Sequence, residues 1–261
     1  MNIVVCIKQV PGTTVVKINQ ENNTLVREGV DSIINPFDTY AIEEGVRLKE
    51  RFGGKVTVIT MGPPQAEAAL KQSIELGADD GILVSDRAFA GSDTLATSYI
   101  LSQAIRKISS YELVITGKQT LDGDTGQVGP EIAQRLDIPF VAYVSAVEDV
   151  NGGKMKVRRM TDEGYEVMES PIPCVMSVSK EINIPRLPSL RGKMRAKSAS
   201  FPVWSAADIE IDTEKIGVAG SPTWVMQIFS PKRARNSAML QGDSQQKVDQ
   251  LCEKLCEIQV I

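Results

Sequence analysis

The chain has 261 residues, of which 42% are hydrophobic and 24% are charged, and its formal net charge at pH 7 is −4. This composition predicts a globular protein with one large core, and the negative charge argues against nonspecific nucleic-acid binding by the whole chain. No apolar run reaches the roughly 20 residues that span a bilayer, so we expect no membrane insertion. The chain starts with an apolar strand pattern in place of a basic signal segment, which predicts a cytoplasmic protein.

The first 150 or so residues alternate predicted strands with predicted helices. Apolar runs typical of buried strands occur at Ile3 to Ile7, Lys55 to Met61, Gly81 to Val84, Glu112 to Thr116 and Phe140 to Val147. Thr13 to Val26, around Asn22-Asn23, has the pattern of a hairpin. The alternation predicts βαβ units and a largely parallel sheet, in which ligands bind beyond the carboxyl ends of the strands.

The predicted helices of this region begin at capping sequences. Asn35 is the expected N-cap of a helix that has Pro36 at its first position and ends at Gly53-Gly54. A second helix follows Gly62-Pro63-Pro64, and Ser92-Asp93 caps a third. Each helix carries apolar residues at helical spacing, so one face of each is expected to pack on the sheet.

The segment from Thr116 to Leu136 carries the clearest functional signal. A glycine-rich loop precedes a helix that has Pro130 in its first turn. Backbone N–H groups of such a loop approach an anion closely, and the helix N-terminus adds partial positive charge, so the composition suggests phosphate binding. Asp122 and Asp124 would repel a phosphate, however, so an ordinary polar connection is the alternative.

Beyond Val150 the pattern changes. Met155 to Met160, Tyr165 to Met168 and Cys174 to Val178 are short or alternating and predict antiparallel additions to the sheet. Ile184 to Ala199 is rich in lysine, arginine and proline and has little periodicity, which predicts a loop. A solvated loop and a docking surface are the two interpretations of this segment.

The C-terminal residues form a separate region. From Ser221 the chain lacks strong periodicity until Asp243, after which one helical stripe contains Val248, Leu251, Cys252, Leu255 and Ile258. An arm with aromatic and apolar side chains covers itself poorly, which predicts contact with a partner. We therefore divide the chain into an α/β domain, residues 1–220, and a C-terminal arm, residues 221–261.

Four cysteines and the absence of histidine limit the chemistry. Cys6, Cys174, Cys252 and Cys256 form no CxxC pair, and we interpret them as buried or half-buried apolar residues, with no metal site. Without histidine there is no Ser-His or Cys-His triad and no general base of the commonest type. We therefore expect no catalytic residue in this chain, and any redox chemistry would come from a bound cofactor.

Several segments, in the same order along the chain, resemble the β subunits of electron transfer flavoproteins. They are VCIKQVP (Val5–Pro11), NPFDTYAIEEGVRLKE (Asn35–Glu50), MGPPQAE (Met61–Glu67), GADDGILV (Gly77–Val84), GKQTLDGDTGQVGP (Gly117–Pro130) and VRRMTDEGYEVMESPIPCVMSV (Val157–Val178). The last is similar to the sequence signature of the family. The resemblance covers nearly the whole chain and implies a Rossmann-like, adenine-nucleotide-binding α/β fold.

The resemblance also implies cofactors and partners. Family members form a heterodimer with an α subunit that holds a flavin; the β subunit carries a structural AMP in ordinary members and FAD in the electron-bifurcating branch. Asp122-Gly123-Asp124-Thr125 followed by Gln127-Val128-Gly129-Pro130 resembles the bifurcating form, which implies FAD, with AMP as the alternative. In that branch NADH is the electron donor. The acceptors are ferredoxin or flavodoxin, which are of low potential, and the α-subunit flavin that serves an acyl-CoA dehydrogenase.

Positions that match the family are expected to line the nucleotide: Cys6, Asn35, Pro36, Phe37, Asp38, Met61, Thr94, Gly117, Lys118, Gln119, Thr120, Leu121, Asp122, Gly123, Asp124, Thr125, Gly126, Gln127 and Val128. For Cys6 and Met61 the alternative is core packing, and for Asn35 it is helix capping. We also expect Gly123 to adopt a positive φ and to leave room for a diphosphate. Leu190 resembles the leucine by which the family docks a dehydrogenase.

Two other classes of protein share this kind of βαβ pattern. An ATP-using adenylating enzyme would place a Ser-Gly-Gly-rich loop after its first strand, where this chain has Lys8-Gln9-Val10-Pro11. A signalling module that binds ATP would leave the C-terminal arm unexplained. Both are therefore weaker interpretations than an electron-transfer subunit.

Overall fold

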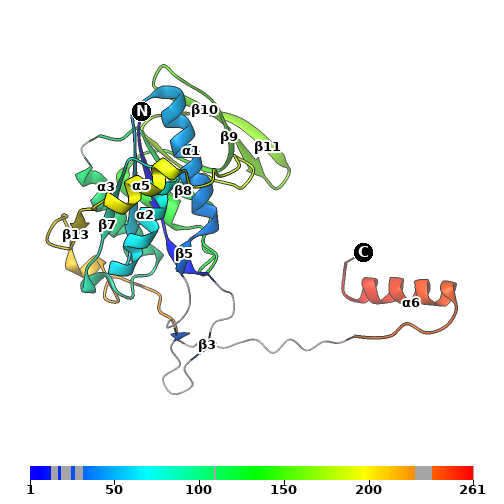
Figure 1. Cartoon of the computed structure of the whole chain (residues 1–261). Helices are drawn as coiled ribbons and strands as arrows, with labels where there is room; N and C mark the ends of the chain where they lie inside the picture. The colour runs from blue at the N-terminus through cyan, green and yellow to red at the C-terminus, as the bar shows by residue number, and fades with distance from the viewer. Residues whose placement is uncertain (13–16, 19–24, 27–31, 109, 227–236, 261) are drawn as a thin grey trace. The chain divides into compact units, whose positions relative to one another are not determined.

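The computed structural model describes residues 1–12, 17–18, 25–26, 32–108, 110–226 and 237–260. Among these residues a nine-stranded sheet forms the central layer of a compact unit, Met1–Met226 (Figure 1). Its strands are β1 (Asn2–Ile7), β6 (Lys55–Met61), β7 (Asp80–Val84), β8 (Leu113–Gly117), β9 (Phe140–Asn151), β10 (Lys154–Thr161), β11 (Gly164–Pro171), β12 (Cys174–Val178) and β13 (Val203–Trp204). Their order across the sheet is β11-β10-β9-β12-β8-β1-β6-β7-β13.

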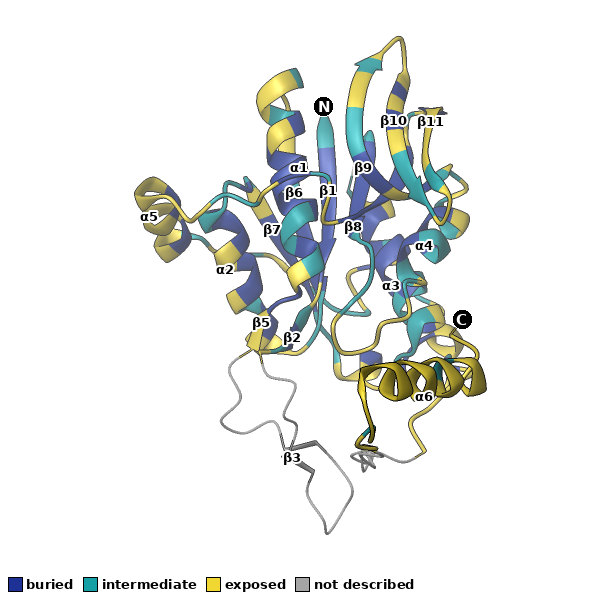
Figure 2. Ribbon diagram, turned by 90° about the vertical axis from the view of Figure 1, so that its right-hand side faces the viewer, coloured by how far each residue is buried: buried dark blue, intermediate teal, exposed yellow. Residues whose placement is uncertain are grey.

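Helices cover both faces of this sheet. Helices α1 (Pro36–Phe52), α2 (Glu67–Glu75) and α5 (Leu190–Ser198) contribute to the core on one face, and α3 (Thr94–Lys107) and α4 (Val128–Leu136) to the core on the other. Along β1, Ile3 and Val5 belong to the first core and Val4 and Cys6 to the second, so neither face of the strand meets solvent (Figure 2). This two-sided burial explains why the strand is a continuous apolar run.

The strand order reverses next to β1. The chain passes from β1 through α1 to β6 and through α2 to β7, and it then returns through α3 to β8 on the opposite side of β1. β1 is parallel to both neighbours, β6 and β8. The expected mostly parallel, Rossmann-like α/β fold is confirmed, and the reversal between β1 and β8 is the point where such sheets bind ligands.

The predicted antiparallel additions are confirmed for two strands and wrong for the third. β10 is antiparallel to β9 and to β11. β12, in contrast, lies between β8 and β9 and is parallel to both. All five β12 residues are buried, so its short apolar run belongs to a covered inner strand and not to an edge.

The prediction of a loop over Ile184 to Ala199 is also wrong, because most of this segment is α5. Both prolines, Pro185 and Pro188, precede the helix, so neither interrupts its hydrogen bonds. Ser189 caps it, with its Oγ accepting a hydrogen bond of 2.9 Å from the Gly192 N–H. Ser189 is a helix start signal, but the many lysine and arginine residues of the segment favoured the prediction of a loop.

Two short pairs of strands lie outside the main sheet. β2 (Gln9–Pro11) is antiparallel to β5 (Ser32–Ile34), which places the residues after β1 beside the start of α1. β3 (Lys17–Ile18) is antiparallel to β4 (Leu25–Val26), as the expected hairpin requires. The Asn22-Asn23 turn and the rest of that hairpin lie outside the described residues.

The second compact unit is Gln227–Ile261, and its described part contains the predicted helix, α6 (Ser244–Glu257). A capping box starts it: Asp243 accepts a hydrogen bond of 2.9 Å from the Gln246 N–H, and the Gln246 side chain accepts one of 3.0 Å from the Asp243 N–H. No residue of α6 is buried. Cys252 and Cys256 are therefore exposed thiols, contrary to our expectation, whereas Cys6 and Cys174 are buried as expected.

In the part of the chain that the structure describes, no helix is both long and apolar enough to cross a membrane.

The packing of α5 against α2 gives a test of the fold. A side chain at Gly192 would overlap the Glu75 carbonyl at the end of α2. Gly192→Ala should therefore lower the free energy of unfolding by about 1–3 kcal/mol, although alanine is the better helix former. Thermal unfolding of the purified protein measures the change. Lys193→Ala, at an exposed position of the same helix, is the control and should stay within about 0.5 kcal/mol of the native protein; equal melting of the two variants would contradict this packing.

Candidate functional site

Three segments meet where the strand order reverses. Lys8 follows β1, Asn35 to Asp38 begin α1, and Gly117 to Val128 join β8 to α4. Because Cys6 of β1 pairs with Thr116 of β8, the carboxyl ends of the two strands lie side by side. Most of the residues expected to line a nucleotide are thus brought to one edge of the sheet.

The buried carboxylate of Asp38 joins the three segments. Its Oδ2 accepts a hydrogen bond of 2.7 Å from the Lys8 N–H, and the carboxylate also accepts bonds from the backbone N–H of Gly117 and from the Asn35 side chain. A Cβ at Gly117 would overlap Asp38 and the Phe37 carbonyl carbon. Glycine is therefore required at position 117 because the end of β8 lies so close to the start of α1, whether or not a ligand also approaches it.

Burial also sets the ionisation of Asp38 and of the neighbouring Cys6. It raises the pKa of Asp38 to about 7, although hydrogen bonds from Lys8, Asn35 and Gly117 act in the opposite direction. Burial, reinforced by the Asp38 charge, raises the pKa of the Cys6 thiol to about 12. Cys6 is therefore an uncharged thiol at neutral pH and is suited to line a site, not to attack a substrate.

The Asn35 side chain anchors the loop and does not cap α1. Its Nδ2 donates to the Gln119 carbonyl at 2.9 Å, and its Oδ1 accepts from the Leu121 N–H at 3.1 Å. The residue occupies the N-cap position, but its side chain makes no capping bond. Capping by the Asn35 side chain, one of the two interpretations of its sequence position, is therefore wrong, because both polar atoms are used across the chain.

The loop turns through two residues with positive φ. Asp124 has φ +53° and Gly126 has φ +63°, and the Asp124 N–H donates to the Thr120 carbonyl at 2.9 Å. Gly123, for which we expected a positive φ, does not have one, and a Cβ there would meet Thr120 Oγ1 at an ordinary 3.4 Å. The left-handed conformation thus falls on Asp124 and Gly126, two residue types that adopt it more readily than most.

The two loop carboxylates are compensated by neighbouring groups. Lys8 Nζ lies 2.8 Å from both oxygens of Asp122. Burial alone would raise the pKa of Asp122, but the hydrogen bond and charge of Lys8 outweigh it, so the pKa is lowered. Asp124 accepts a hydrogen bond from the Gln119 side chain. The objection that these carboxylates repel phosphate is thereby weakened.

Helix α4 begins at Val128, so Pro130 lies in its first turn as predicted. At this helix start, the Thr94 hydroxyl of α3 donates to Gln127 Oε1 at 3.1 Å and to Glu131 Oε1 at 3.4 Å. Pro130 has no N–H and the Glu131 N–H donates to the Gln127 carbonyl at 3.1 Å, which leaves the Val128 and Gly129 N–H groups of the first turn for an anion. Thr94 therefore stands at the end of the loop, at the edge of the site.

The remaining residues that we predicted to bind the nucleotide or a partner differ in burial and in position. Phe37 and Lys118 are half-buried, whereas Pro36 and Thr125 are exposed. Met61 ends β6 and packs, partly buried, against the core under α3 and α4, which agrees with the core alternative. Leu190 is the first residue of α5, on a segment separate from the loop, and its side chain is 78% exposed.

Buried polar atoms without partners support a ligand at this edge. Five buried polar side-chain atoms of the described residues make no hydrogen bond, and two of them, Thr116 Oγ1 and Glu131 Oε2, lie at this edge. A Cβ at Gly129 would lie 2.9 Å from Thr116 Oγ1, so the absence of a side chain there lets the helix start pack closely against the strand end. Sequence reasoning did not select Thr116; its signal was a hydroxyl residue at the end of an apolar strand. The Thr116 hydroxyl can donate a hydrogen bond to a phosphate, whereas Glu131 Oε2 accepts and would pair with a donor such as a sugar hydroxyl, so the two atoms together fit a nucleotide.

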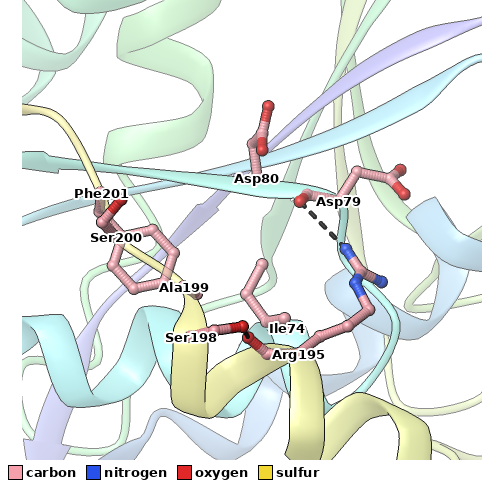
Figure 3. A pocket seen from close by; sticks show the side chains of 8 residues that line it. All are labelled: Ile74, Asp79, Asp80, Arg195, Ser198, Ala199, Ser200 and Phe201. Atoms are coloured by element: carbon pink, nitrogen blue, oxygen red, sulfur yellow. Dashed lines mark hydrogen bonds between the residues drawn. The ribbon is translucent and has the colours of Figure 1, made fainter.

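A hollow of about 220 Å³ lies elsewhere in the unit (Figure 3). It is lined by Ile74, Asp79, Asp80, Arg195, Ser198, Ala199, Ser200 and Phe201. Its Arg195 donates to the Asp79 carbonyl at 3.2 Å, and Asp79 itself is paired with Lys49 at 3.0 Å. The hollow lies at the amino end of β7, where parallel sheets do not bind ligands, so we assign the site to the loop.

Comparisons with known proteins match the chain over most or all of its length. Residues 22–209 match the electron transfer flavoprotein domain. The whole chain is 47% identical to the electron transfer flavoprotein subunit beta of Thermoanaerobacterium thermosaccharolyticum, over the full length of both proteins. It is 49% identical to the protein FixA of Azotobacter vinelandii, over 93% of this chain and 89% of that protein. It is 43% identical, over the full length of both, to the caffeyl-CoA reductase-Etf complex subunit CarD of Acetobacterium woodii.

The ionisation of Asp38 predicts a dependence of stability on pH. An acid with a raised pKa in the folded state binds more protons when folded, so its contribution to stability is greatest below pH 4. The contribution falls by up to about 1.4 kcal/mol per pH unit between its unfolded pKa of 3.8 and its folded pKa of about 7. Asp38→Asn cannot ionise, so the difference in stability between variant and native protein should shift in favour of the variant as pH rises through this window. Thermal unfolding at a series of pH values measures it.

Asp208→Asn is the matched control. Asp208 is exposed, and hydrogen bonds from Ser205 lower its pKa. Its contribution is therefore lost as pH falls, which is the opposite sign. A difference between Asp38→Asn and the native protein that stays constant from pH 4 to pH 7 would refute the assigned ionisation.

Proposed function

The chain belongs to the electron transfer flavoprotein family, as a β subunit, and from that premise we propose that the loop from Gly117 to Val128 binds FAD, which accepts electrons from NADH. The single observation that carries the proposal is the anchored loop: Asn35 and Asp38 fix it at the strand-order reversal, and the Thr116 hydroxyl is buried and unpaired beside it. A nucleotide is the ligand class that this arrangement fits.

Space on the outer side of the loop favours FAD over AMP. A Cβ at Gly123 would meet only Thr120 Oγ1, at 3.4 Å, and Lys8 Nζ, at 4.0 Å, and Leu121 next to it is 51% exposed. A second phosphate and the group beyond it therefore have room in front of Gly123. The Lys8 ammonium, held at this place by Asp122, has a further N–H that can donate a hydrogen bond to the diphosphate.

The roles of this chain's residues are binding and orientation. Bound FAD would supply the redox chemistry, accepting electrons in pairs and releasing them singly to two acceptors. The loop amides, the Thr116 hydroxyl and the start of α4 would hold the phosphates, and Cys6, Phe37 and Met61 would pack against the nucleotide. None of these residues is asked to transfer a proton, which agrees with the absence of histidine.

The proposed partners follow from family membership and from the exposed surface. We propose a heterodimer with an electron transfer flavoprotein α subunit, in the cytoplasm, with ferredoxin or flavodoxin as the low-potential acceptor. The α-subunit flavin would serve an acyl-CoA dehydrogenase docked at Leu190. A relative whose name places it in a caffeyl-CoA reductase-Etf complex supports an enzyme of CoA thioesters as the partner. Leu190, Leu187 and Met194 are exposed on and before α5, beside basic side chains, which supports docking there.

The nucleotide content of the co-expressed heterodimer tests the function. Acid release and chromatography should give two FAD molecules per heterodimer. One FAD with one AMP would refute the bifurcating form and leave an ordinary β subunit with a structural AMP.

Substitutions at Gly123 test whether the loop binds the nucleotide that is released from the heterodimer. Gly123→Ala should retain both flavins, because the chain tolerates a Cβ there. Gly123→Val should lose one flavin per heterodimer, because the branched side chain enters the space proposed for the diphosphate. Retention of both flavins by the valine variant would remove this part of the loop from the site.

The C-terminal residues from Ser221 onward are proposed to pack on the α subunit. Val248, Leu251 and Ile258 of the α6 stripe are exposed, and burying each would contribute about 1.5–3 kcal/mol to association. Deleting Asp243 to Ile261 should therefore dissociate or weaken the heterodimer while the α/β unit stays folded. Size-exclusion chromatography of the co-expressed pair, with circular dichroism of the separated chain, measures both.

Point variants of α6 sharpen this test. Leu251→Lys places a charge in the stripe and should reproduce the effect of the deletion, whereas Lys247→Ala, outside the stripe, should not. A heterodimer of unchanged affinity after deletion would show that the arm does not hold the partner.

A further inference from the structure

Tyr143 has a backbone conformation that is unusual for a residue within a strand. Its φ is +57°, in the left-handed region, where a side chain with a Cβ costs roughly 1–2 kcal/mol. The other described residues of this kind, glycines apart, are Asp124 in the loop, Asp137 at the end of α4 and Gln259 after α6. Those positions are turns, whereas Tyr143 lies inside β9.

A bulge between β9 and β12 imposes this conformation. Val141 pairs with Met176 and Val144 with Val178, so two residues of β9 stand opposite Ser177 alone. The Tyr143 N–H donates to Ser177 Oγ at 3.0 Å, and the next carbonyl, that of Val144, accepts from the Ser179 N–H at 3.0 Å. Hydrogen bonds to Ser177 and Ser179 therefore hold Tyr143 in its strained conformation.

The strain does not serve core packing. Val141 and Val144 on either side are buried, but the Tyr143 side chain is 39% exposed. Glycine or asparagine would adopt the same φ at lower cost if only the bend of the strand mattered. The bulge therefore has the effect of presenting an aromatic ring outside the core, and strained residues of this kind concentrate at functional sites.

The ring is presented at the nucleotide edge. Val144 pairs with Val178, and Val178 pairs with Gly117, the last residue of β8, so Tyr143 lies level with the start of the loop. Lys118, the next loop residue, places its Nζ 4.9 Å from the centre of the Tyr143 ring. An ammonium over an aromatic face is a cation–π contact; it shows that this face of the ring lies toward the loop, where a stacked ring would take the place of the flexible Lys118 side chain.

We propose that Tyr143 is a stacking platform for a planar aromatic ring carried beyond the phosphates of the bound nucleotide, which for FAD is the flavin ring. The inference rests on the proposed function and adds a residue outside the loop that distinguishes a dinucleotide from AMP. AMP ends at its phosphate and has no group to reach the platform. Aromatic pairs of this kind contribute beyond simple burial, which gives Tyr143 a role in nucleotide selection.

Competition at the β-subunit site tests the proposal. Isotope-labelled AMP is bound to the co-expressed heterodimer and displaced with FAD or with unlabelled AMP. The release of label is measured, so the α-subunit flavin does not contribute to the signal. Tyr143→Gly should weaken displacement by FAD by several-fold to about tenfold, and displacement by AMP by less than twofold. Tyr143→Phe keeps the ring and should match the native protein for both ligands. Thermal unfolding is the folding control, since glycine relieves the φ strain and should not lower the melting temperature.

Each other result overturns the proposal in a distinct way. Equal losses for FAD and AMP would make Tyr143 a residue that shapes the loop. Unchanged FAD displacement in Tyr143→Gly, with the native protein binding FAD, would refute the platform and leave the proposed function intact. A native heterodimer that binds AMP but is not displaced by FAD would refute the proposed function, and the platform with it.

Discussion

The site depends on one buried carboxylate. Asp38 stands at the start of α1 and accepts hydrogen bonds from the backbone after β1 and from the end of β8, so it ties together the three segments that meet at the strand-order reversal. A carboxylate in this position carries a desolvation cost, which its raised pKa records, and hydrogen bonds from N–H groups offset part of it. The corner is therefore preorganised at some cost in stability, as is common at binding sites.

The loop after β8 follows from this corner. Asn35, one turn before Asp38 on the same helix start, uses its amide to hold Gln119 and Leu121, and Lys8 neutralises Asp122. An acidic glycine-rich loop thereby becomes compatible with a phosphate ligand. The resulting edge has the first N–H groups of α4, an unpaired Thr116 hydroxyl and the Lys8–Asp122 ion pair, which fits the proposed nucleotide.

Helix α1 also connects this site to the segment that leads into α5. Its buried Glu43 and its exposed Glu50 both pair with Arg186, at 2.8 Å and 2.7 Å, and its Glu44 accepts a hydrogen bond of 3.1 Å from Asn183. Burial would raise the pKa of Glu43, but hydrogen bonds from Arg186 and Arg47, together with the Arg186 charge, lower it, so this contact persists at neutral pH. One helix thus carries the nucleotide corner at its first turn and the proposed docking segment on its later turns.

The sequence by itself determined the α/β class, the order of most strands and helices, the family and the central loop, because these depend on local periodicity, capping residues and ordered motifs. Only the tertiary structure decided that β12 is a parallel inner strand, that Asn35 holds the loop in place of capping its helix, and that Thr116 has an unmet hydrogen bond. It also placed the positive φ on Gly126 and brought Tyr143 beside Lys118. These features depend on pairings between residues far apart in the chain, and a linear pattern of residue types carries no record of such partners.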